Sequence, residues 1–323
     1  MQAISIGLTS SSPICAIPFL SDISLCRRTS MTGSGHIMDP VWVDYPTLIH
    51  VQDTVLEGLL DDSTGALVLS LTLKRAEMAI QDVAILVRSS DLINREQIAQ
   101  CLKLLVQSAK RSSHGVLKIS FEAEAAIKGA IAMHEYAFDS IRHSHAIAYR
   151  RSTVDGVVLK QFTYTLDYLF RQVNRLIPTY QSQISALMEI ETHLDTLHGL
   201  INQDGILYPI AKEDVLAELW SMLTCERPTV SSEKIQKNFA LLDEYGSNRH
   251  SALVTAGSGL AALQGLMHGI QDVRKHMSHP LPASPIPVEV QLGSIQDALR
   301  RFTTAVVKFQ RDNDRVSSAA KDM

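Results

Sequence analysis

The densest group of ionisable side chains is residues 134–151, HEYAFDSIRHSHAIAYRR, whose residue types could bind a metal ion. Its histidines are His134, His143 and His145. On a helix, His134 and His145 would lie about 16 Å apart along the axis, and His143 and His145 would point to different sides. Neither pair can hold one metal ion, and the segment has no HExxH or Glu-x-x-His motif. We therefore predict histidines packed at a helix interface and no metal centre.

A second candidate is the glycine motif at residues 257–262, GSGLAA, which fits the dinucleotide-binding pattern G-x-G-x-x-A. Such a site needs a strand before the glycines and a helix N-terminus facing the pyrophosphate. Glu289, the candidate ribose ligand, lies about thirty residues further on, beyond the usual twenty or so. Apolar residues at helical spacing also run through the glycines without a change of phase. A nucleotide-binding enzyme is therefore only a remote alternative.

The favoured interpretation of the same glycines is a helix face made of small residues, on which another helix backbone packs closely. This predicted helix-packing face consists of Gly257, Ala261, Gly265 and Gly269. The sequence has no GxSxG motif, no P-loop and no protein-kinase motifs. We therefore predict no catalytic residue, no cofactor and no metal ligand.

Two basic clusters could form binding surfaces. The candidate basic surface is Arg142, Arg150, Arg151 and Lys160, and a second cluster is Arg300, Arg301, Lys308, Arg311 and Arg315. Such clusters are usually solvated helix faces, but beside an amphipathic helix they can also bind an anionic membrane surface. The formal net charge of −4 argues against general affinity for nucleic acid.

Long amphipathic helices must position all of these residues. The clearest apolar stripe runs over residues 159–201 with alternating steps of three and four, which is typical of a helix that packs along its whole length. Its members are Leu159, Phe162, Leu166, Leu169, Val173, Leu176, Tyr180, Gln183, Leu187, Ile190, Leu194, Leu197 and Ile201. Only Gln183 is polar. Pro178 lies inside this segment, and because the phase is kept across it we expect a kink and no break. The stripe must be covered by other helices of the chain or by a second copy.

Shorter stripes predict the other helices. We expect them near 45–60, 69–87, 98–109, 119–148, 212–224, 235–277 and 288–309. The motif KRSSHG (110–115) is expected to end one helix, and Gly246 to bend another. Four prolines between Pro280 and Pro287 make residues 279–287 a stiff connector.

The composition favours an all-α protein, because aromatic residues are sparse, at 6% of the 323 residues, and Ala, Leu, Ile and Val form most of the apolar content. We expect an elongated antiparallel helical bundle with coiled-coil-like helices at 41–312, a mostly disordered leader at 1–40 and a polar tail at 313–323. The four cysteines have no metal-binding spacing and suit a reducing, intracellular and cytoplasmic location. Neither residues 1–21 nor 250–271 are apolar enough to predict a transmembrane span.

Several passages resemble a known family. They are LSLTLKRAEMAIQDVAILVRSSDL (69–92), LLDEYGSNRHSALVTAGSGLAALQGL (241–266) and IPVEVQLGSIQDALRRF (286–302), with shorter matches at 194–201 and 215–223. Their order resembles that of an uncharacterised family of helical proteins from mushroom-forming fungi, over most of residues 41–302. The resemblance implies a helical fold. It carries no functional residue, because no activity, ligand or partner is known for the family.

From these patterns we expect a non-enzymatic helical scaffold or protein-interaction protein, which self-associates or binds partner helices. A peripheral membrane-binding module that uses the basic clusters is the alternative.

Overall fold

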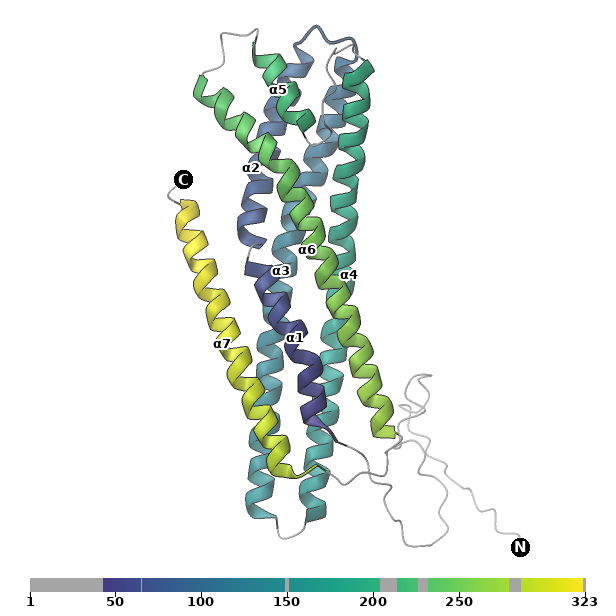
Figure 1. Cartoon of the computed structure of the whole chain (residues 1–323), viewed down its shortest axis with the longest axis vertical. Coiled ribbons are helices and arrows are strands. Elements are labelled where there is room, and N and C mark those ends of the chain that lie inside the picture. Colours follow the sequence, from purple (N-terminus) through teal and green to yellow (C-terminus); the bar gives the residue numbers. More distant parts are fainter. Residues whose placement is uncertain are drawn as a thin grey trace, which may run out of the picture. The chain divides into compact units, whose positions relative to one another are not determined.

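The computed structural model describes residues 43–64, 66–148, 151–203, 214–225, 232–278 and 286–321. The chain divides into two units, Met1–Pro40 and Val41–Met323, and all the described residues belong to the second. These residues form helices and no strand (Figure 1). The helices are α1 (Tyr45–Thr64), α2 (Ala66–Arg88), α3 (Arg95–Ile147), α4 (Arg151–Gln203), α5 (Val215–Cys225), α6 (Ser232–Ser278) and α7 (Val288–Lys321). The predicted all-α helical bundle is thereby confirmed.

The bundle is built on a hairpin of two helices, α3 and α4, each 53 residues long. At 1.5 Å per residue each helix extends about 80 Å. The connection between them is only residues 148–150, so the two helices run antiparallel. Polar contacts between the two helices confirm the antiparallel arrangement, because the residue numbers of the α4 partners decrease as those of the α3 partners increase. The contacts are Cys101–His193, Ser108–Glu189, Ser112–Gln183, Glu122–Thr179 and Ala126–Tyr168.

The long stripe of α4 is covered within the chain. Every stripe position from Phe162 to Ile201 is buried, and Leu159 is partly buried. The helix continues through Pro178, whose ring is exposed, so the proline does not break it. Burial of one large aliphatic side chain contributes roughly 1.5–3 kcal/mol, so this stripe is a major source of stability.

Two hydrophobic clusters follow each other along the hairpin. The first joins α1, α7 and the later part of α6 to residues 119–141 of α3 and 154–180 of α4. The second joins α2, α5 and the earlier part of α6 to residues 98–116 of α3 and 187–201 of α4. The core is divided into two clusters because α1 and α2 lie one after the other along the hairpin, while α6 runs past both (Figure 1).

Two expected helix boundaries are wrong. Residues 110–115 lie inside α3, and α7 continues to Lys321, beyond the helix end expected near residue 309. In α3 the reason is tertiary packing. Ser112 and Ser113 are buried, and a Cβ at Gly115 would overlap the side chain of Gln183 from α4. Residues 110–115 resemble the end of a helix in the sequence. In the structure they instead remain helical and contribute to a polar contact between α3 and α4.

Side-chain clamps fix the outer helices. The Gln291 side chain of α7 accepts a hydrogen bond from the Tyr45 N–H at 2.8 Å and donates one to the Val43 carbonyl at 2.8 Å. Arg301 of α7 also forms an ion pair with Asp53 of α1. In the described part of the chain, no helix is both long and apolar enough to cross a membrane.

Candidate functional site

The histidines of the 134–151 segment do not come together. His134 is fully buried, and its Nε2 lies 2.8 Å from the Gln52 Oε1 of α1. Burial lowers the pKa of this imidazole to about 4. His145 is exposed and lies 3.3 Å from Glu289 of α7. Among the described residues, no group of three or more His, Cys, Asp or Glu side chains could hold a metal ion.

The glycine motif lies within α6, where residues 252–262 are helical. The strand and tight turn of a dinucleotide site are therefore missing at this position, so the GSGLAA motif does not form the dinucleotide-binding turn. The predicted helix-packing face is also wrong at three of its four positions. A Cβ at Gly257 or Gly265 would meet nothing within 4 Å, and Ala261 is exposed. Only Gly269 is closely covered, by Val51 of α1.

Within this motif, the glycine that does pack against another helix is Gly259. It lies between Gly257 and Ala261 in the sequence and is not a member of the predicted helix-packing face. A Cβ at Gly259 would overlap the buried ring of Tyr180 from α4. Gly129 of α3 receives the Tyr168 hydroxyl in the same way. Glycines in this bundle therefore make room for long side chains of the neighbouring helix, which their spacing along one helix could not reveal.

The candidate basic surface lies near the turn between α3 and α4. Arg142 precedes the end of α3, pairs with Asp139 at 2.9 Å and lies 5.2 Å from the Phe138 ring centre. Arg151 begins α4 and is exposed, and Lys160 lies 5.7 Å from the Tyr164 ring centre. Arg150 lies outside the described residues. The arginine next to an acid and the two aromatic contacts are typical of a solvated helix face.

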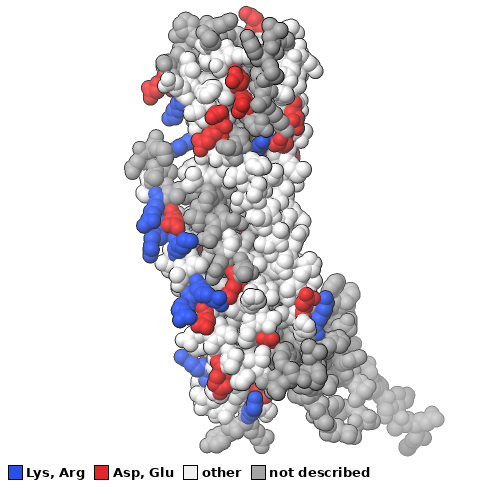
Figure 2. All heavy atoms as spheres, in the orientation of Figure 1, with Lys and Arg blue, Asp and Glu red and all other residues white. Residues whose placement is uncertain are grey.

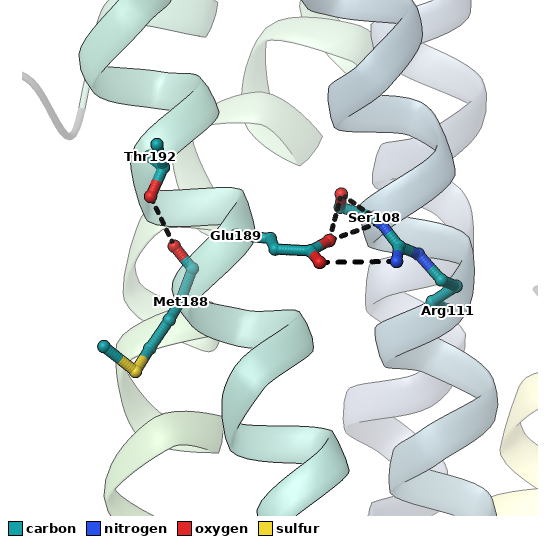
Figure 3. A network of polar contacts seen from close by, with 5 residues as sticks. All are labelled: Ser108, Arg111, Met188, Glu189 and Thr192. Carbon is teal, nitrogen blue, oxygen red and sulfur yellow. Dashed lines mark hydrogen bonds and ion pairs between the residues drawn. The ribbon is translucent and has the colours of Figure 1, made fainter.

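A polar belt joins α3 to α4 near the middle of the hairpin, and we define it as Ser108, Arg111, Ser112, Gln183 and Glu189. Figure 3 shows Arg111 and Ser108 of α3 pointing toward Glu189 of α4. The Ser108 hydroxyl donates to Glu189 at 3.2 Å, Arg111 pairs with the same carboxylate, and Gln183 donates to the Ser112 hydroxyl at 2.8 Å. Since Arg111 and Glu189 are about half exposed, their pair adds little stability, and the belt mainly fixes register.

The outer face of α7 is the strongest candidate for a binding surface. A surface hollow of about 520 Å³ is lined there by the outer α7 face, which we define as Leu299, Arg300, Thr303, Thr304, Val307, Lys308 and Arg311. Between residues 299 and 311 the sequence has four basic residues and no acidic residue. Arg301 points inward to Asp53, and the other three lie on this face, where Arg300 also pairs with Asp297 at 2.8 Å. In Figure 2, Lys and Arg side chains gather along the side where α7 runs, with some acidic side chains among them.

The spacing on this face is that of a helix-packing seam. Arg300, Thr304, Val307 and Arg311 follow one another by four, three and four residues. A straight partner helix contacts positions with this spacing. Val307, which is 47% exposed, is the only apolar residue among these four, and Val290 of the same helix is exposed to a similar degree at 49%.

No model of a protein family matches the chain, and no curated protein matches it. The architecture itself defines the class, which is an all-α bundle arranged around one long helical hairpin. The resemblance to helical proteins of mushroom-forming fungi rests on the sequence passages alone.

Proposed function

We propose that this chain is a non-catalytic helical interaction protein that binds an acidic amphipathic helix of a partner protein along the outer α7 face. The observation that carries the proposal is the seam formed by Arg300, Thr304, Val307 and Arg311, at the spacing that a partner helix requires. The apolar centre supplies contact area, and the flanking cations favour a partner with Asp and Glu beside its own apolar stripe.

Self-association through the α4 stripe is not part of this proposal. That stripe was the reason to expect a second copy, and its side chains are buried against other helices of the same chain. The outer α7 face is rich in cations, so two copies of it would repel each other. A partner of opposite charge suits it better.

A defined peptide tests the proposal. The probe is a synthetic helical peptide with leucines spaced alternately by three and four residues along one side and glutamates beside the leucines. The control peptide carries lysines in place of the glutamates. We expect the acidic peptide to bind, and its binding to weaken as salt is raised from 50 mM to 500 mM, because exposed charges are screened. The lysine peptide should not bind.

Charge reversal assigns the surface. The triple variant Arg300→Glu, Lys308→Glu, Arg311→Glu should lose binding of the acidic peptide. A matched triple at exposed positions of the other cluster and of α4, Arg142→Glu, Lys160→Glu, Arg175→Glu, should bind like the parent. Equal loss in both triples, or no binding by the parent, would contradict the proposal. Binding of the parent to anionic vesicles without any affinity for the peptide would favour the membrane alternative.

A further inference from the structure

A cavity of about 360 Å³ lies where the two hydrophobic clusters meet. It is bounded by the start of α2, the middle of α3 and α4, and the first half of α6. Its walls combine members of both clusters, because Ile119 and Tyr180 belong to the first and Val116, Ala252 and Ala256 to the second. Its size is at the lower end of the range of small-molecule sites in proteins.

The polar atoms of this cavity are few. Gln183 is only 2% exposed, and its Oε1 has no hydrogen-bond partner among the described residues, although its Nε2 donates to Ser112. The Asn248 Nδ2 is also buried and without a partner in the described part of the chain. Neither atom has an accessible surface, and the Gln183 Oε1 lies against Gly115 of α3, so neither atom faces the cavity.

The charge of the lining restricts the ligand. Glu244, an exposed residue of α6, is the only Asp, Glu, Lys or Arg among the described lining residues. An anion would therefore leave water for a site without a cation, next to a carboxylate, and this is costly. The remaining walls are aliphatic, with a tyrosine ring and three hydroxyl-bearing residues (Thr72, Ser251 and Thr255).

We propose that this mid-bundle cavity binds a small, uncharged and mostly apolar molecule. The apolar part of this molecule lies against Val116, Ile119 and Ala256. The outer α7 face does not line the cavity, so this proposal is independent of the proposed function.

The test uses the whole chain, the uncharged dye Nile red, and two competitors of equal length, 1-decanol and decanoate. We expect one dye site per chain, displaced by decanol at a concentration about tenfold lower than that needed for decanoate, because the carboxylate must be desolvated. Equal displacement by both competitors would contradict the proposed ligand class.

Two variants locate the dye. Ala256→Phe fills the cavity from its wall, and Ser251→Trp covers it from an exposed position where the fold should tolerate the change. Both should abolish dye binding, while Ala261→Phe on the exposed side of α6 and the charge-reversed α7 triple should bind dye like the parent. If Ala256→Phe does not fold, Ser251→Trp decides. Undiminished dye binding by a folded Ser251→Trp protein, or no binding by the parent, would overturn the proposal.

Discussion

At the scale of single residues, His134 is the titratable group whose position has the clearest consequence. It is fully buried, and burial lowers the pKa of its imidazole from 6.5 to about 4. Between these pH values the unfolded chain binds a proton that the folded chain does not. The stability that depends on neutral His134 is therefore complete above pH 6.5 and is lost as the pH falls toward 4.

We predict that His134→Gln is less sensitive to acid than the parent. From pH 7 to pH 4 the parent should lose about 3 kcal/mol of unfolding free energy through His134, a loss that the variant lacks. Denaturant melts of both proteins at the two pH values measure this difference. His145→Gln is the control, since His145 is exposed, and it should keep the acid sensitivity of the parent. Parallel pH dependence of the parent and His134→Gln would show that His134 is not buried as described.

The glycines of α6 give a second residue-scale prediction. Gly265→Ala should stabilise the protein by about 0.5–1 kcal/mol, because the site is exposed and open and alanine favours helix. Gly259→Ala should destabilise it by about 1–3 kcal/mol, because the new methyl group overlaps the buried Tyr180 ring. Thermal midpoints that move in the same direction would contradict the assignment of the two faces.

At the scale of helices, spacing of apolar residues predicted the α4 stripe correctly from Phe162 to Ile201, since a seven-residue pattern directly reports which side is buried. The sequence pattern gave wrong predictions at Gly115, where a helix end was expected, and at Gly257, where contact with another helix was expected. Whether a glycine ends a helix, faces water or receives a neighbouring side chain depends on the partner helix, which is distant in sequence. The one signal that could have located the polar belt was Gln183, the single polar member of the stripe.

The stripe of α4 gives a matched pair of substitutions. Leu187→Asp should destabilise the fold by several kcal/mol, because Leu187 is 1% exposed and the carboxylate would be buried without a partner. Met188→Asp, the next residue, should change stability by less than about 0.5 kcal/mol, because Met188 is 58% exposed. Denaturant melts that show equal losses for the two variants would place the core on the wrong side of α4.

The polar belt makes a prediction about register. Gln183→Leu should destabilise the protein by about 1–3 kcal/mol, although it adds an apolar residue to an apolar stripe. The Ser112 hydroxyl would lose its 2.8 Å partner, and the branched leucine would have to fit against Gly115. The double variant Ser112→Ala, Gln183→Leu measures the coupling, and a coupling of zero in the double-mutant cycle would remove the register role.

At the scale of the whole molecule, the long α4 stripe is buried against other helices of the same chain, in two hydrophobic clusters. We therefore predict that the midpoint of denaturant unfolding does not change between 1 and 100 μM protein, because no second copy is needed to cover a core. A midpoint that rises with concentration would mean that folding and association are coupled, and the long stripes would then have to be shared between copies.

The central claim is that the outer α7 face binds an acidic helix of a partner protein, and site-specific photo-crosslinking tests it most directly. A photo-reactive residue replaces Val307 in the full chain, inside cells that make the protein, with the membrane fraction kept. Val254 of α6, which is 58% exposed, serves as the control position. We predict a crosslink from position 307, and not from 254, to one protein, mapped within a helical segment that carries Asp and Glu beside an apolar stripe. Crosslinks from 307 to lipid alone, or to proteins that position 254 captures equally, would contradict the account.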